Sequence, residues 1–322
     1  MLAQTIVSFL VGLGIILAAS QLFLKIAERL ATQLRFSPLF ISLVVIALGT
    51  NLPEISLTIS SLQQGDPGLA MGNILGSSIL NITLILGLSL LFNSVRIGTH
   101  KTLYNALLLL GHTMLFIGLK FSAFGHFERA IILIISLLMT ITVQYLMALN
   151  GRNHEDKKLL KSMKQLIKKK HPMPWYLSVF GLAASTVGLS FGGSITVSTI
   201  GQLSELLNIS TTILGLTLTA IATSAPELIL TTIAAFKKED KVVVGTLLGS
   251  NIINLSLLPG IILLFSQPIS LNPAEFIFLL FSTVSVVSLI FAYKGENVPR
   301  AAGLVLLGIA ALFIYTTFAL VW

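Results

Sequence analysis

The sequence predicts an all-α membrane protein of ten transmembrane helices, arranged as two inverted five-helix repeats with broken helices at the midplane. Three observations support this fold class. Charged residues make up 10% of the chain and hydrophobic residues 55%, whereas a soluble domain carries about 25% charged residues. The apolar runs are continuous and reach the ~20 residues that a membrane-spanning helix needs. Finally, a stretch with one carboxylate in apolar surroundings occurs twice, at a constant offset.

The apolar runs predict ten spans joined by short connections. The spans cover residues 2–25, 37–62, 68–92, 102–120, 127–149, 174–201, 210–236, 241–266, 273–293 and 300–321. They should be helices, because every backbone polar group in a bilayer must be satisfied within its own segment or in a closed barrel. The one long connection, 150–173, is strongly basic and predicts a solvated cytoplasmic linker. Anionic lipid headgroups are a candidate partner for this linker, since they attract basic juxtamembrane runs.

The basic residues also predict an orientation. Lys and Arg accumulate in cytoplasmic loops. With the linker in the cytoplasm and five spans on each side of it, both termini lie outside, and only Lys120 and Arg129 of the 20 basic residues fall on the outer side. The prediction is a multi-pass protein of the plasma (inner) membrane. The location of the positive charge at span ends argues against nucleic acid as a partner.

The repeated stretch divides the chain into two units. Residues 47–54 read Ala-Leu-Gly-Thr-Asn-Leu-Pro-Glu, and 220–227 read Ala-Ile-Ala-Thr-Ser-Ala-Pro-Glu. A second polar cluster follows each, at 72–81 and 245–254, and one offset of 173 residues relates both pairs. Because each unit holds an odd number of spans, the second enters the membrane from the opposite side. Inverted repeats of this kind are a recurrent plan of secondary transporters.

The predicted organisation follows these repeats. A first five-helix repeat covers 1–149, with its motif region at 40–92; a basic cytoplasmic linker covers 150–173; and a second five-helix repeat covers 174–322, with its motif region at 213–265.

Two carboxylates are singled out by their depth in the spans. Of the 12 acidic residues, only Glu54 and Glu227 lie deep within predicted helices, and no basic residue lies at their depth. An intramembrane charge without a partner is expensive and marks a functional site. The missing partner is predicted to be a bound cation or a proton. A protonated glutamate that hydrogen-bonds a neighbouring helix is the structural alternative.

The surrounding residues favour a metal-type cation. Pro53 and Pro226 precede the two glutamates and should break their helices, freeing carbonyl oxygens. Further oxygen ligands are expected from the side chains of Thr50, Asn51, Ser77, Asn81, Thr223, Ser224, Ser250 and Asn254. The chain has no Cys, and its His residues lie outside the repeat. Such hard donors suit Ca²⁺ or Na⁺ rather than softer ions. Four glycines at four-residue spacing, Gly72, Gly76, Gly245 and Gly249, predict close helix packing beside this set.

These motifs resemble the repeats of the calcium/cation antiporter superfamily, and most closely those of its prokaryotic sodium/calcium exchangers. The family pattern is Gly-Thr-Ser-Leu-Pro-Glu followed by Gly-Asn-x-x-Gly-Ser-Asn-x-x-Asn/Asp. It corresponds to 49–54 with 72–81, and to 222–227 with 245–254. The resemblance implies that spans 2, 3, 7 and 8 form a compact core, across which the long first and sixth spans slide.

The resemblance also implies roles for individual residues. Glu54 and Glu227 would be the central calcium and sodium ligands. Flanking sodium sites would use oxygens of Thr50, Ser77, Thr223 and Ser250, with backbone carbonyls of Ala47 and Ala220, while Asn81 and Asn254 would complete the middle. The departures from the family pattern are Asn51 for Ser, Ala222 for Gly, Ala225 for Leu, and Asn254 where several members carry Asp.

The resulting expectation is an antiporter that exchanges Na⁺ for Ca²⁺ by alternating access, with no cofactor, no enzymatic activity and no obligate protein partner. One alternative is a Ca²⁺(cation)/H⁺ antiporter of the same superfamily, but that branch typically carries an acidic residue where this chain has the uncharged stretches 73–75 and 246–248. A passive cation channel would need a continuous polar pathway. A membrane enzyme would need a nucleophile and base that the motifs do not supply.

Overall fold

The computed structural model describes residues 2–33, 47–92, 96–97, 100–150, 174–236, 240–266, 272–293 and 296–319. Within these ranges, eight helices are long and apolar enough to cross a membrane, and a bent pair, Thr211–Thr223 with Ala225–Phe236, provides a ninth. The predicted spans are recovered to within a few residues at most ends. The start of the predicted second span, 37–46, lies outside the described residues, as does the linker 151–173.

The helices of the first half are α1 (Leu2–Gln33), α3 (Ala47–Thr50), α4 (Leu52–Gln63), α5 (Pro67–Leu80), the π-helical η2 (Asn81–Ile85), α6 (Leu86–Phe92), α7 (His100–Lys120) and α8 (His126–Asn150). Those of the second half are α10 (Trp175–Leu207), α11 (Thr211–Leu214), the π-helical η3 (Gly215–Thr219), α12 (Ala220–Thr223), α13 (Ala225–Phe236), α14 (Asp240–Phe265), α15 (Pro273–Ala292) and α16 (Arg300–Ala319).

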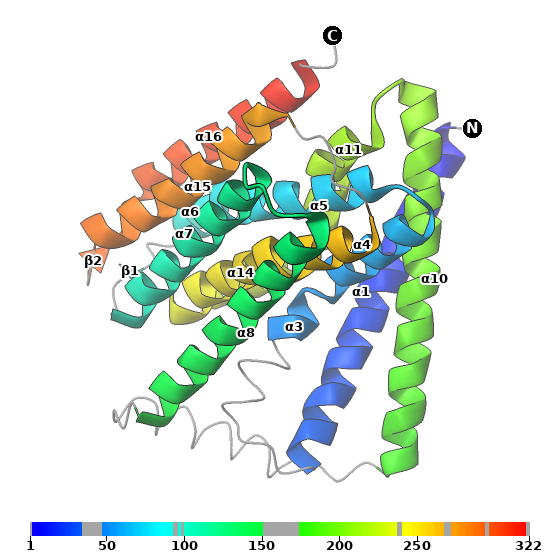
Figure 1. Cartoon of the computed structure of the whole chain (residues 1–322), viewed down its shortest axis with the longest axis horizontal. Coiled ribbons are helices and arrows are strands. Elements are labelled where there is room, and N and C mark those ends of the chain that lie inside the picture. The colour runs from blue at the N-terminus through cyan, green and yellow to red at the C-terminus, as the bar shows by residue number, and fades with distance from the viewer. Residues whose placement is uncertain are drawn as a thin grey trace.

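One helix, α5, lies at the centre of the molecule and is buried on every side (Figure 1). A helix that is apolar all round is expected to be enclosed by other helices rather than to face solvent with one side. α5 packs against α4, α11, η3, α12 and α14. Its neighbours therefore include both interrupted helices, so that α5 joins segments of the two halves of the chain.

The two longest helices, α1 and α10, form a separate pair beside this core, seen at the right of Figure 1. The two helices approach closely at Gly192, where an added Cβ atom would lie 2.9 Å from the carbonyl oxygen of Gly12. α10 also packs on α4, and α1 makes no comparable contact with α13 within the described ranges. The pair is therefore seated mainly against the first half of the core.

A polar seam joins α10 to α4. The Ser56 hydroxyl donates to the Leu189 carbonyl at 2.7 Å. The Gln64 amide donates to the Ser194 carbonyl at 3.1 Å and accepts from the Ser198 hydroxyl at 3.0 Å. This seam was not predicted, because its residues lie outside the two repeated stretches, 47–54 with 72–81 and 220–227 with 245–254.

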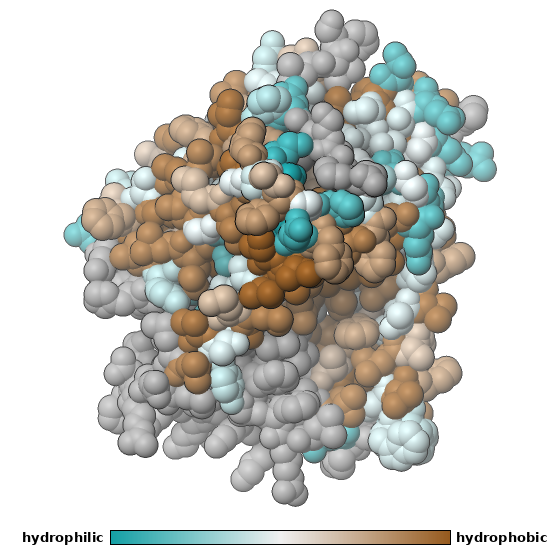
Figure 2. All heavy atoms as spheres, in the orientation of Figure 1, coloured by the Kyte–Doolittle hydropathy of each residue, from teal (hydrophilic) through white to brown (hydrophobic). Residues whose placement is uncertain are grey.

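The outer surface of the helices is apolar, as a lipid-facing surface must be. Figure 2 shows hydrophobic side chains across the middle of the visible face, with hydrophilic ones toward its upper and right edges. On α10, Phe180, Val187 and Phe191 are all more than half exposed. One short antiparallel pair, β1 (Arg96–Ile97) with β2 (Glu296–Asn297), joins two helix connections; this pair was not predicted.

Small residues set the packing around α5. A Cβ atom at Gly76 would overlap the Leu216 carbonyl and lie 2.7 Å from Ala220 Cβ, and one at Gly72 would lie 3.1 Å from the Leu216 amide nitrogen. The predicted close packing is confirmed for this pair. At Gly245 and Gly249 no described atom lies within 4 Å of such a Cβ. Their expected partners, which the 173-residue offset places at Leu39 and Leu43, fall outside the described residues, so the second pair stays a prediction.

We expect Gly76→Ala to destabilise the protein by about 1–3 kcal/mol, because the added methyl meets backbone that cannot move without separating two packed helices. Gly118→Ala is the matched control, since a Cβ there meets no described atom within 4 Å. The control should keep or slightly raise the unfolding temperature in detergent. Equal unfolding temperatures for the two variants would contradict the proposed role of Gly76 in packing.

Candidate cation site

The helices that carry the two glutamates are both interrupted, at corresponding positions. Asn51 separates α3 from α4, and Ser224 separates α12 from α13; both have ψ near 8°, far from the helical value of about −42°. The second pair of helices is bent by 44°. Each interruption lies two residues before a proline, which cannot donate the next helical hydrogen bond. The predicted breaks are thus present.

The breaks place each glutamate in the first turn of a new helix. Glu54 lies in the first turn of α4 and Glu227 in that of α13. The amide dipoles at a helix N-terminus stabilise a carboxylate there. This explains why the chain interrupts both helices just before the acidic residue, rather than after it.

Both carboxylates are buried, each being 1% exposed. The Oε1 atom of Glu227 accepts from the Ser250 hydroxyl at 3.1 Å. Glu54 lies beside the Thr223 hydroxyl and within electrostatic reach of Glu227. The Oε2 atoms of both glutamates are buried without a hydrogen-bond partner in the described part of the chain. A buried carboxylate charge without such a partner has to be balanced by a positive charge that binds from outside the protein.

Hydroxyl groups link the two halves around these carboxylates. The Ser77 hydroxyl donates to the carbonyl of Ala220 at 3.4 Å and lies 3.5 Å from the Thr223 hydroxyl. On the other side, the Asn51 amide donates to the Ser250 hydroxyl at 3.4 Å and to Thr50 Oγ1 at 3.5 Å. Residues that lie more than 140 positions apart in the sequence are therefore brought together.

The remaining predicted residues lie in the same elements. Asn81 is the first residue of η2, directly after α5, and is buried; its amide donates to Asn251 Oδ1 at 2.9 Å. Asn254, on α14, is buried, and both of its amide atoms lack a hydrogen-bond partner among the described residues, as does the hydroxyl of Ser224. Ala47 begins α3 and Ala220 begins α12, so their carbonyls belong to the short helices before the breaks.

Sequence reasoning missed two polar residues in this cluster. Asn73 accepts from the Thr223 hydroxyl at 3.2 Å. Asn251 contacts Asn81 and also donates to the carbonyl of Ser78 at 2.8 Å. Both asparagines stand in otherwise apolar helices, where an unpartnered amide is costly. That signal, together with their place in the second polar motif, could have identified them.

The ligand atoms of the cluster are of the type that hard cations prefer. The described residues contain no group of three or more His, Cys, Asp or Glu side chains, so the negative charge comes from two glutamates and the other candidate ligands are neutral oxygens. Two carboxylates balance one Ca²⁺, and 6–8 oxygens are typical of its coordination. The same oxygens suit Na⁺.

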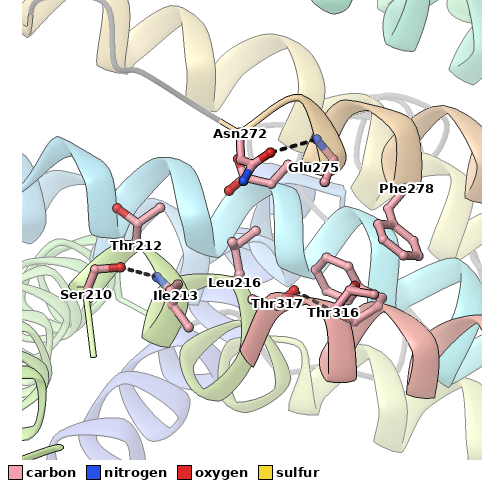
Figure 3. Close-up of a pocket in the computed structure, with 11 residues that line it drawn as sticks. Ser210, Thr212, Ile213, Leu216, Asn272, Glu275, Phe278, Thr316 and Thr317 are labelled. Carbon is pink, nitrogen blue, oxygen red and sulfur yellow. Dashed lines mark hydrogen bonds between the residues drawn. The ribbon is translucent and has the colours of Figure 1, made fainter. Parts of the chain in front are cut away.

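A separate cavity of about 260 Å³ lies between α11, α15 and α16 and contains none of these residues (Figure 3). Ser210, Thr212 and Thr317 contribute hydroxyls to it. Glu275 contributes a half-buried side chain, whose Oε2 atom is itself buried without a hydrogen-bond partner in the described part of the chain. Glu275 therefore offers a third acidic side chain, outside the cluster, for comparison with the two central glutamates.

Comparisons with known proteins cover nearly the whole chain. The family model described as sodium/calcium exchanger protein matches residues 4–148 and 177–319. The sodium/calcium exchanger MaX1 of Methanosarcina acetivorans is 27% identical over 99% of each chain, and CaxA of Alkalimonas amylolytica is 30% identical over 78% of each. The solved sodium-calcium exchanger NCX_Mj has a TM-score of 0.65 at 25% identity, covering 98% of this chain and 99% of that one.

We expect Ca²⁺ to raise the unfolding temperature of the purified protein, because a cation that binds only the folded state stabilises it, by about 2.7 kcal/mol at one hundred times its dissociation constant. Glu54→Gln and Glu227→Gln should lose most of this shift. Glu275→Gln should retain it. A shift of the same size in all three variants would place the bound cation elsewhere.

Proposed function

The chain belongs to the sodium/calcium exchanger family, and we propose that it is a secondary active antiporter that exchanges Na⁺ for Ca²⁺ by alternating access. Family members are multi-pass membrane transporters that exchange cations for Ca²⁺, not enzymes. The observation that carries the proposal is the pair of buried glutamates, each with an unpartnered carboxylate oxygen and each at the start of a broken helix. The transported ions are Ca²⁺ and Na⁺, and no cofactor is required.

The proposed architecture has ten spans in two inverted repeats, covering 1–149 and 174–322, with motif regions at 40–92 and 213–265. The matching interruptions at Asn51 and Ser224 support it. We place the protein in the plasma membrane with both termini outside and the basic linker 150–173 in the cytoplasm, where anionic lipid headgroups would attract it. In this orientation Gln64 and Ser198 lie on the outer side.

We assign the oxygens around the breaks to the transported ions. Glu54 and Glu227 would bind Ca²⁺ at the centre. The side chains of Thr50, Asn51, Ser77, Asn81, Thr223, Ser224, Ser250 and Asn254, and the carbonyls of Ala47 and Ala220, would supply the other ligands for Ca²⁺ or Na⁺. Because the neutral groups cannot balance charge, the two glutamates determine the ionic charge that the site holds.

The same charge would couple the two fluxes. One Ca²⁺ neutralises two carboxylates, and two Na⁺ do so as well. An empty site would leave two buried negative charges uncompensated, and moving apolar helices across it would be expensive. The moving helices would therefore cross an occupied site but not an empty one. Each ion would then leave only in exchange for the other.

The moving part would be the pair α1 and α10. In the structure α10 is held against α4 by the seam at Ser56, Gln64 and Ser198, on the proposed outer side. The inverted repeat predicts a matching contact of α1 with α13 on the inner side. Among the described residues, α1 and α13 make no contact as extensive as that of α10 with α4. We therefore assign the structure to a state that is closed outside and open toward the cytoplasm.

The direct test of function is uptake of labelled Ca²⁺ into proteoliposomes under an imposed Na⁺ gradient. We expect uptake that depends on the Na⁺ gradient in wild type and falls by at least about tenfold in Glu54→Gln or Glu227→Gln, because a site with only one carboxylate no longer balances Ca²⁺. Uptake that ignored Na⁺ and followed a pH gradient would instead indicate cation/H⁺ exchange. Persistent single-channel currents would indicate a channel.

The seam can be tested by cross-linking, since the chain contains no native cysteine. A short thiol cross-linker between cysteines in Gln64→Cys/Ser198→Cys should arrest exchange, because it prevents α10 from leaving α4. Reduction of a cleavable linker should restore the rate. Each single cysteine variant, treated in the same way, is the control. Full exchange in the cross-linked double variant would exclude separation of α10 from α4 during transport.

A further inference from the structure

Asn251 lies between two groups of the first repeat and contacts both. Its Nδ2 atom donates to the carbonyl of Ser78 at 2.8 Å, and its Oδ1 atom accepts from Asn81 Nδ2 at 2.9 Å. All three residues are buried. Asn251 itself belongs to α14 in the second repeat, so the contact also joins the two halves of the chain.

The chemistry of these groups fixes the orientation of both amides. A backbone carbonyl can only accept, so Asn251 must turn its NH₂ group toward Ser78. The oxygen of Asn251 then faces Asn81, which must donate a hydrogen bond from its own NH₂ group. The remaining Asn81 atom, Oδ1, is buried and has no hydrogen-bond partner among the described residues. The carbonyl of Ser78 thus determines, through Asn251, which end of Asn81 stays available.

We infer that Asn251 is a positioning residue that makes Asn81 present its carbonyl oxygen, rather than its NH₂ group, to the transported cations. This inference depends on the proposed function, in which Asn81 is a cation ligand. Only the oxygen of an amide can coordinate a cation, and a flipped amide would place donor hydrogens toward the positive charge. Asn251 need not touch the ion to have this effect.

The second half of the site lacks the corresponding contact. The 173-residue offset relates Asn251 to Ser78, and Asn81 to Asn254. A symmetric arrangement would therefore require residue 78 to hold Asn254. Serine is too short to do so: the Ser78 hydroxyl and both amide atoms of Asn254 are buried without a hydrogen-bond partner in the described structure. Asn81 is oriented by the protein, whereas Asn254 is left to be oriented by the ion.

A double-mutant cycle tests the first half of the inference. In Na⁺-driven Ca²⁺ uptake, Asn251→Ala should raise the apparent KM for Ca²⁺ by about two- to tenfold, the equivalent of one hydrogen bond, with a smaller change in maximal rate. Asn81→Ala should also raise the KM, and the double variant should be no worse than Asn81→Ala alone, because Asn251 acts through Asn81. Ser89→Ala, which removes a buried hydroxyl away from the site, is the control and should keep the wild-type KM.

Independent, additive effects of Asn251→Ala and Asn81→Ala, or a wild-type KM in Asn251→Ala, would overturn the positioning role. Those outcomes would leave the proposed function standing, because wild type would still exchange Ca²⁺ for Na⁺. Absence of Na⁺-driven uptake in wild type would instead refute the function itself.

The second test predicts a lower KM for Ca²⁺, a change that misfolding of the variant cannot produce. Ser78→Asn introduces an amide at the position that the 173-residue offset relates to Asn251. It should lower the KM for Ca²⁺ by holding Asn254 in place. The same substitution in an Asn254→Ala background should have no effect on the KM. A KM that stays unchanged or rises in Ser78→Asn, or falls equally in both backgrounds, would overturn the assignment of Ser78 as the missing partner.

Discussion

The structure depends on the cost of burying two carboxylates in an apolar helix bundle. Glu54 and Glu227 are almost fully enclosed, and each has an oxygen without a partner in the described chain. A buried unpaired charge costs several kcal/mol. The breaks at Asn51 and Ser224 reduce that cost by turning helix N-termini toward the carboxylates, and the surrounding hydroxyls supply part of the lost hydration. What remains is the free energy that a bound cation would recover.

Close packing around α5 is what allows these groups to meet. Gly72 and Gly76 bring α5 against the backbone of η3 and α12, so that Ser77, on the same face, reaches the carbonyl of Ala220. A larger side chain at either glycine would move the hydroxyl away from the break. The residues that bind and the residues that pack are therefore interleaved at four-residue spacing on one helix.

Much of this arrangement could be predicted from the sequence. Helical spans follow from apolar length, and the broken helices follow from proline beside a buried glutamate. Ser77 and Asn81 follow from their shared helix face. The contact between Asn251 and Asn81 could not be predicted, because it depends on the relative height of two helices that the sequence does not specify. The seam at Gln64 could not be predicted for the same reason, since it depends on where Ser194 and Ser198 of α10 lie relative to the end of α4.

Several hydrogen bonds between α5 or the first break and the rest of the cluster cross from one half of the chain to the other, as Asn51 with Ser250 and Asn73 with Thr223 do. A single half would hold one carboxylate and no complete cage. In the proposed inverted topology, an ancestral protein of one repeat could have bound an ion only by pairing with a copy of itself inserted upside down in the membrane. In that view, joining the copies in one chain would allow the two halves to differ, as Ser78 and Asn251 do at positions related by the 173-residue offset.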